Sequence, residues 1–91
     1  MDWKRKAISD LKHYGLLKKS LVRTKKEDSI EYALSQLTKD ERLVLDKFII
    51  NRTEFCIYEC EDELHYKRSK LYELRNKALY KFATFMYGDI E

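Results

Sequence analysis

The sequence contains no proline and only two glycines, Gly15 and Gly88, among its 91 residues. Proline and glycine interrupt helices and form most tight turns, so their scarcity predicts long helices joined by few turns. Lys, Leu and Glu, all good helix formers, are the commonest residues. We therefore expect an all-α fold of four to five helices. The length of the chain predicts a single domain over residues 1–91.

The N-terminal part of this domain, residues 1–36, is expected to hold a basic helix and a connecting helix. Apolar residues at spacings of three or four form a stripe on the first helix, residues 2–21: Trp3, Ala7, Leu11, Tyr14, Leu17 or Lys18, and Leu21. Gly15 weakens this helix and is a candidate for a kink. The connecting helix starts at a Thr24–Glu27 capping box or at Asp28. Its inner face is predicted to comprise Ile30, Ala33, Leu34 and Leu37.

A second capping box predicts the start of the C-terminal part, residues 37–88. Thr38 and Glu41 have the spacing at which each side chain accepts a hydrogen bond from the backbone N–H of the other residue. The helix that follows is predicted to run to about residue 50, where the polar residues 51–53 break it. Its inward side chains are expected to be Leu45, Phe48 and Ile49, with Leu43 or Val44 at the boundary.

Two further helices are expected after this break. The first is a short helix over residues 54–64, followed by a turn at residues 65–66. The second is a long helix that starts near Arg68 and ends at Gly88, since glycine tolerates the left-handed conformation of a helix C-cap. Its apolar stripe is predicted to comprise Leu71, Leu74, Ala78, Phe82 and Phe85. A short helix, a turn and a longer basic helix form the order of a helix-turn-helix.

Residues 37–79 also resemble region 4 of bacterial sigma factors, with no gap in the match. Leu37-Thr38-Lys39-Asp40-Glu41-Arg42-Leu43-Val44-Leu45 has the form L-T-x-x-E-R-x-V-L. Residues 58–64 stand at the short helix of that region, residues 67–72 at the start of its recognition helix, and Ala78-Leu79 at the A-L pair that follows.

Two positions depart from the sigma pattern. Glu61 stands where a small Ala is usual, so we expect it at the edge of the helix pair or the two helices to pack differently, because burying an unpaired carboxylate is costly. Lys67 stands where a Ser or Thr usually caps the recognition helix. Ser69 is an alternative cap, which would shift the helix start by two residues.

Within that superfamily the chain is most similar to small phage regulators of the ArpU and RinA type. Their first helix carries a W-x-x-x-A-x-x-x-L-x-x-Y pattern, which is matched here by Trp3, Ala7, Leu11 and Tyr14. Residues 79–88 resemble their C-terminal segment. The resemblance implies a phage or prophage protein that activates late or packaging genes at a promoter.

The charges alternate along the chain. Residues 1–27 carry a net charge of +6, residues 28–66 a net charge of −6 and residues 67–91 a net charge of +3. The two basic segments are therefore the ones suited to face phosphate. For the basic first helix three interpretations stay open: a DNA-binding arm, a homodimerisation helix, or a helix packed on its own domain.

The N-terminal turns of a recognition helix are the ones that reach base edges, which predicts nine DNA-contacting residues. We call them the contact set: Lys67, Arg68, Ser69, Lys70, Tyr72, Glu73, Arg75, Asn76 and Lys77. Arg68 has the chemistry to read guanine, Asn76 has that to read adenine, and Lys77 suits phosphate. Further candidates for phosphate contact are Lys39, Arg42 and Arg52.

Metal binding and catalysis have little support in the sequence. Cys56, Cys60 and His65 are close in sequence but fall short of the four ligands of a structural zinc site. We expect Cys60 in the core and Cys56 partly exposed. No Gly-rich phosphate loop and no HExxH motif is present. The expectation is a protein that is not an enzyme, with no cofactor, metal or small-molecule substrate.

Neither an apolar run long enough to span a membrane nor a secretory signal is found, so we expect a cytoplasmic protein with reduced cysteines. The predicted function is sequence-specific binding of double-stranded DNA by a transcriptional regulator, with RNA polymerase as a further partner. Two alternatives are a DNA-recognition subunit of a phage packaging machine and a helical module that binds RNA polymerase without touching DNA.

Overall fold

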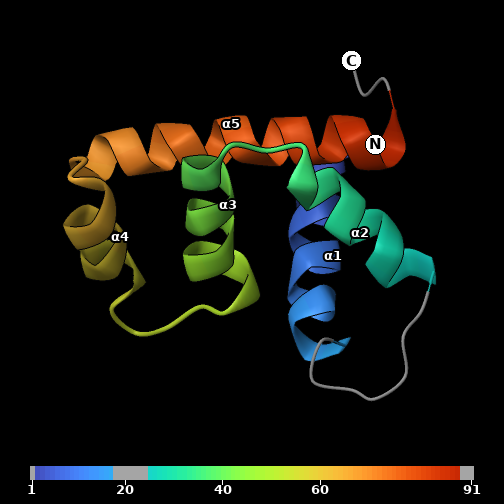
Figure 1. Ribbon diagram of the computed structural model, residues 1–91, viewed down its shortest axis with the longest axis horizontal. Coiled ribbons are helices and arrows are strands. Elements are labelled where there is room, and N and C mark those ends of the chain that lie inside the picture. The colour runs from blue at the N-terminus through green and yellow to red at the C-terminus, as the bar shows by residue number, and fades with distance from the viewer. Residues whose placement is uncertain (1, 18–24, 89–91) are drawn as a thin grey trace.

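A computed structural model describes residues 2–17 and 25–88 of the chain. These residues form helices and turns and no strand, which confirms the predicted all-α fold (Figure 1). The elements in chain order are α1 (Trp3–Leu17), α2 (Lys25–Ser35), α3 (Lys39–Leu45), the π-helical turn η1 (Asp46–Ile50), α4 (Cys56–Leu64) and α5 (Arg68–Tyr87).

Helix α5 is the longest element and lies along one edge of the molecule (Figure 1). The helices α4 and α3 descend from its N-terminal half, and α1 and α2 descend from its C-terminal half. Helix α5 therefore packs against all four other helices. Its N-terminal half is joined to the acidic part of the chain, and its C-terminal half to the basic first helix.

Buried apolar side chains from every helix form one cluster within the described residues. Helix α5 contributes Leu71, Ala78, Leu79, Phe82 and Ala83, and Leu74 is half-buried. The predicted stripe is wrong at Phe85, which is 46 % exposed. The reason is that α1 and α2 pack against the side of α5 that carries Leu79 and Ala83, so the core lies away from Phe85.

The capping box at the start of α3 is confirmed. Thr38 Oγ1 accepts a hydrogen bond from the Glu41 backbone N–H at 3.2 Å, and Glu41 Oε1 accepts one from the Thr38 N–H at 2.9 Å. The predicted helix to residue 50 is present, but its last turn is the π-helix η1, in which the Asn51 N–H donates to the Asp46 carbonyl at 2.7 Å. Val44, Leu45, Phe48 and Ile49 are buried.

Gly15 lies inside the continuous helix α1 rather than at a break between two helices. A Cβ atom at this position would lie 2.5 Å from the Ile50 carbonyl oxygen. The glycine thus permits a close approach of α1 to η1. The predicted continuation of the first helix to residue 21 and the capping box at Thr24 lie outside the described residues.

The predicted core position of Cys60 is confirmed, but the expectation for Cys56 is wrong, because Cys56 is only 5 % exposed. The two residues are one helical turn apart on α4, so they share the face that packs against η1 and α5. Glu61 is partly exposed, which agrees with its predicted place at the edge of the helix pair.

Candidate nucleic-acid interface

A three-residue turn joins α4 to α5. His65 ends α4 in the left-handed conformation, with φ 58° and ψ 33°, and its N–H donates to the Glu61 carbonyl at 2.9 Å. Few residues other than glycine, asparagine or aspartate adopt this conformation, which reverses the chain after a helix. Tyr66 and Lys67 complete the turn, and α5 begins at Arg68. Two helices joined by a turn of this length are typical of a helix-turn-helix.

The turn is anchored to α3. The hydroxyl of half-buried Tyr66 donates a hydrogen bond to Asp40 Oδ2 at 3.3 Å, in the first turn of α3. Helix α3 also packs along α5 and adjoins α4. The start of α5 is therefore held from two sides, by the turn and by α3.

The start of α5 agrees with the sequence prediction. Lys67 occupies the N-cap position with extended backbone and makes no side-chain cap hydrogen bond. The alternative in which Ser69 caps the helix is wrong, because the backbone is already helical at Arg68 and Ser69 lies in the first turn. The helix ends at Gly88 as predicted, although φ 82° and ψ −148° place this glycine outside the left-handed helical region.

The contact set lies together on the turn and the N-terminal half of α5, and eight of its nine residues are exposed. Arg75 is half-buried. Five of the nine residues are cationic and one, Glu73, is acidic. This half of α5 therefore presents a cluster of positive charge next to an acidic helix, since α4 contains four carboxylates and no Lys or Arg.

Two members of the contact set are fixed by stacking. The Tyr72 ring packs edge-on against the buried Phe48 of η1, with ring centroids 5.9 Å apart. The Arg75 guanidinium lies 5.1 Å from the centroid of the Tyr72 ring, and its Nη2 donates to Asn76 Oδ1 at 3.4 Å. Cation–π stacking of this kind restricts the guanidinium to one orientation. Tyr72 thus connects the exposed surface to the core.

The three other candidates for phosphate contact are also exposed. Lys39 and Arg42 line a groove of about 480 Å³ whose walls include Glu31, Asp46 and Glu63. These carboxylates offset the positive potential of the two cations. Arg52 lies in the segment between η1 and α4. The contact set has the greater excess of positive charge.

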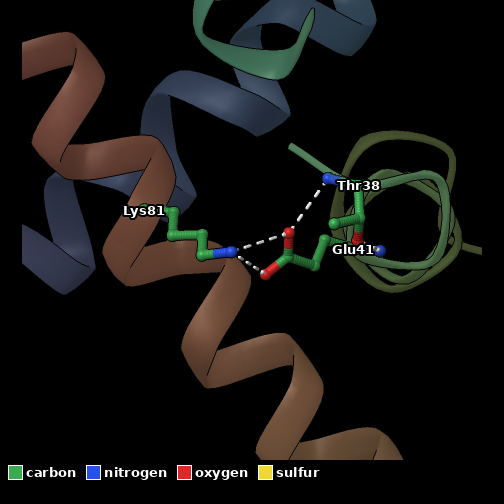
Figure 2. A network of polar contacts seen from close by, with 3 residues as sticks. All are labelled: Thr38, Glu41 and Lys81. Atoms are coloured by element: carbon green, nitrogen blue, oxygen red, sulfur yellow. Dashed lines mark hydrogen bonds and ion pairs between the residues drawn. The ribbon is translucent and has the colours of Figure 1, made fainter. Parts of the chain in front are cut away.

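An ion pair between the buried Glu41 and the half-exposed Lys81 links α3 to α5 (Figure 2). Lys81 Nζ lies 3.1 Å from Oε2 of Glu41, which is only 2 % exposed, and the same carboxylate accepts the Thr38 N–H of the capping box. Burial raises the pKa of Glu41, but the Thr38 hydrogen bonds and Lys81 together lower it below its ordinary value. The role of Lys81 could not be predicted from the sequence, because its partner lies 40 positions away.

A second polar cluster joins α1, α2 and the end of α5. The nearly buried Asp10 accepts a hydrogen bond from the Tyr87 hydroxyl, and its other oxygen lies 3.0 Å from Lys26 Nζ. Burial raises the pKa of Asp10, but these partners lower it below its ordinary value overall. The pKa of Tyr87 is raised by burial and by its bond to Asp10. The C-terminal half of α5 is thereby attached to the basic first helix.

Burial and the neighbouring Cys56 raise the pKa of the Cys60 thiol to about 11, so this thiol is neutral near pH 7. Within residues 2–17 and 25–88, no group of three or more His, Cys, Asp or Glu side chains is arranged to hold a metal ion. None of the described helices is long and apolar enough to cross a lipid bilayer.

Comparison of the chain with protein-family models, with curated proteins and with solved structures found no significant match. The resemblance to sigma region 4 and to the small phage regulators stays a prediction.

Proposed function

We propose that this protein binds duplex DNA through the contact set and regulates transcription, with the N-terminal turns of α5 in the major groove. The observation that carries the proposal is an exposed cluster of cations at the start of a helix that follows a three-residue turn. In DNA-binding proteins with this arrangement, the second helix enters the groove by its N-terminal residues.

The shape of α5 suits this role. The major groove is about 12 Å wide and admits one helix. Arg68 and Ser69 lie in the first turn of α5 and are exposed, so their side chains are accessible to base edges. Arg68 suits the two acceptors of guanine, and Asn76, two turns later, suits adenine.

The remaining cations suit the DNA backbone. Lys67 and Lys70 are exposed at the start of α5, and Lys77 is exposed about two turns after Lys70. Lysine contacts to phosphate oxygens fix the position of a protein on DNA and carry no sequence information themselves. The acidic α4 lies on the other side of the turn, where it is repelled by phosphate. DNA is thus directed to α5.

Selection from random duplex DNA tests this proposal. The wild-type protein should enrich one sequence, and Arg68→Ala should weaken binding to it by about 1–3 kcal/mol while relaxing the preference at one position. Lys77→Ala should weaken all sequences alike. Lys12→Ala is the control, since Lys12 is exposed on α1 away from the contact set. Failure to enrich any sequence, or wild-type binding by both contact-set variants, would refute the proposal.

A protein-binding role is the second candidate, and one feature favours it. Phe55 is 58 % exposed and Tyr58 is 64 % exposed, and both lie on or beside the acidic helix α4. Exposed aromatic side chains are common at protein interfaces. Under this alternative, Tyr58→Ala abolishes binding to RNA polymerase, and the protein retains no duplex DNA in a gel shift at low salt.

A further inference from the structure

The outer face of α5 continues beyond the contact set. Ser69, Glu73, Asn76 and Tyr80 are exposed and follow at spacings of four, three and four, so they share one face of the helix. Tyr87 follows Tyr80 after two turns on the same side of the helix and is half-buried against Lys6 and Asp10 of α1. The C-terminal half of α5 therefore presents a surface in line with the predicted DNA-contacting residues.

The first turn of α1 packs beside this surface. The Trp3 ring contacts the Tyr80 ring edge-on, with centroids 5.7 Å apart and an interplanar angle of 81°. Lys6 Nζ lies 4.6 Å from the centroid of the Tyr87 ring. The two contacts hold the start of α1 next to the outer face, and Figure 1 shows the N-terminus at this end of α5.

Positive charge predominates at this end of α1. Lys4 and Lys6 are exposed in the first turn of α1 and project on either side of Trp3 around the helix. Asp2 accepts the Arg5 N–H at 3.1 Å and pairs with the Arg5 guanidinium at 3.8 Å, so its charge is offset. The single carboxylate of α1, Asp10, is nearly buried and paired with Lys26 and Tyr87. Lys4 and Lys6 remain as the net charge.

The spacing along α5 places Tyr80 and Tyr87 beyond the width of the major groove. A helix rises about 1.5 Å per residue, so Tyr80 and Tyr87 lie roughly 14 to 24 Å beyond the turn centred near residue 71. The major groove is only about 12 Å wide. A helix inserted by its N-terminal turns therefore passes over a strand of phosphates before it reaches Tyr80.

We propose that Lys4 and Lys6 form a second phosphate-binding site, which contacts the duplex backbone beside the bases read by the contact set. This inference rests on the proposed function. It gives the first helix two roles, since its apolar stripe packs on the domain while its N-terminal lysines bind DNA. Phosphate contacts would then lie on one flank of the recognised sequence, beyond the reach of α4–α5 alone.

Binding to duplexes of two lengths tests the second site. The probe is the selected duplex, either cut at the edges of the enriched sequence or extended on each side by about ten base pairs, one helical turn. On the extended duplex, Lys4→Ala should weaken binding about three- to tenfold and reduce the salt slope by about 0.9, the value for one phosphate. On the short duplex, the Lys4→Ala variant should bind like the wild type. Lys4→Arg should restore binding.

Lys12→Ala is the matched control. Lys12 is exposed on the same helix, on the side away from Trp3 and about 12 Å along the helix axis from Lys4. The Lys12→Ala variant should bind both duplexes like the wild type. The second site is refuted if Lys4→Ala binds the extended duplex like the wild type, loses the same affinity on both duplexes, or matches Lys12→Ala. If Arg68→Ala still weakens binding in that case, the proposed function stands and only the second phosphate-binding site is lost. If the wild type binds no duplex, both fall.

Discussion

Glu41 in the first turn of α3 and Lys81 in α5 form an ion pair across 40 positions of the chain, with Lys81 Nζ 3.1 Å from Oε2 and 3.2 Å from Oε1 of Glu41. Figure 2 shows that the same carboxylate also binds the Thr38 N–H. One side chain thus completes the cap of α3 and attaches that cap to α5, the helix that carries the contact set.

Removal of Lys81 should destabilise the fold. Lys81→Ala leaves the buried Glu41 carboxylate without its cation, and an unsatisfied buried charged group costs about 2 to 3 kcal/mol. Urea denaturation at pH 7 measures the loss. Lys77→Ala, an exposed lysine on the same helix, is the control and should change stability by less than about 0.5 kcal/mol. Equal effects of the two variants would contradict the importance of the ion pair.

Acid should destabilise the protein through Glu41 and Asp10. Their pKa values in the folded state lie below the ordinary values of 4.5 and 3.8, so the unfolded state takes up more protons as the pH falls. The contribution of each group is present above its unfolded pKa and is lost as the pH drops through the folded pKa. Stability should therefore decline below about pH 4.5.

The variant Glu41→Gln isolates one of these groups. Glutamine keeps the capping hydrogen bonds but cannot titrate. Urea midpoints measured from pH 7 to pH 3 should fall less steeply for this variant than for the wild type, although it is less stable at pH 7. Parallel curves would show that Glu41 does not contribute to the acid sensitivity.

Gly15→Ala should destabilise the protein, although alanine favours a helix by about 0.5–1 kcal/mol over glycine. The added Cβ would lie 2.5 Å from the Ile50 carbonyl oxygen, so α1 and η1 must separate. Overpacking typically costs about 1–3 kcal/mol, and we expect a net loss of about 1 kcal/mol in thermal or urea unfolding. Ser9→Ala, at an exposed site of α1, is the control. A Gly15→Ala variant more stable than the wild type would contradict the close contact.

The turn before α5 should prefer glycine at position 65. His65 has φ 58°, a conformation that costs roughly 1 kcal/mol for a residue with a Cβ atom. His65→Gly should retain or slightly increase stability, whereas His65→Val should lower it by more than 1 kcal/mol, because β-branched residues rarely adopt positive φ. Thermal unfolding compares the three proteins. If the valine variant were as stable as the wild type, the turn geometry would be wrong.

The boundaries of the C-terminal helices could be predicted because local signals mark them. Thr38 and Glu41 carry a capping pattern within four residues, residues 51–53 are polar, and Gly88 follows the last helix. The exposure of most of the contact set could be predicted from the periodicity of α5, in which buried and exposed residues alternate with the helical repeat.

Features that depend on contacts between distant segments could not be predicted. The exposure of Phe85 follows from the side on which α1 and α2 pack, and its spacing in the sequence matched a core position. The role of Gly15 depends on Ile50, which lies far along the chain. The stacking of Trp3 on Tyr80 also joins distant parts of the sequence, so the packing of the first helix on α5 could not be told apart from its other two possible roles by sequence alone.

The salt dependence of DNA binding tests the central claim most directly. Each phosphate contact contributes about −0.9 to the slope of log K against log salt, so a contact set of several cations predicts a slope between about −3 and −6. Fluorescence anisotropy with the selected duplex at increasing KCl concentrations gives this slope, and Lys70→Ala and Lys77→Ala should each make it shallower by about 1. A wild-type slope near zero, or identical slopes for all three proteins, would contradict DNA binding by α5.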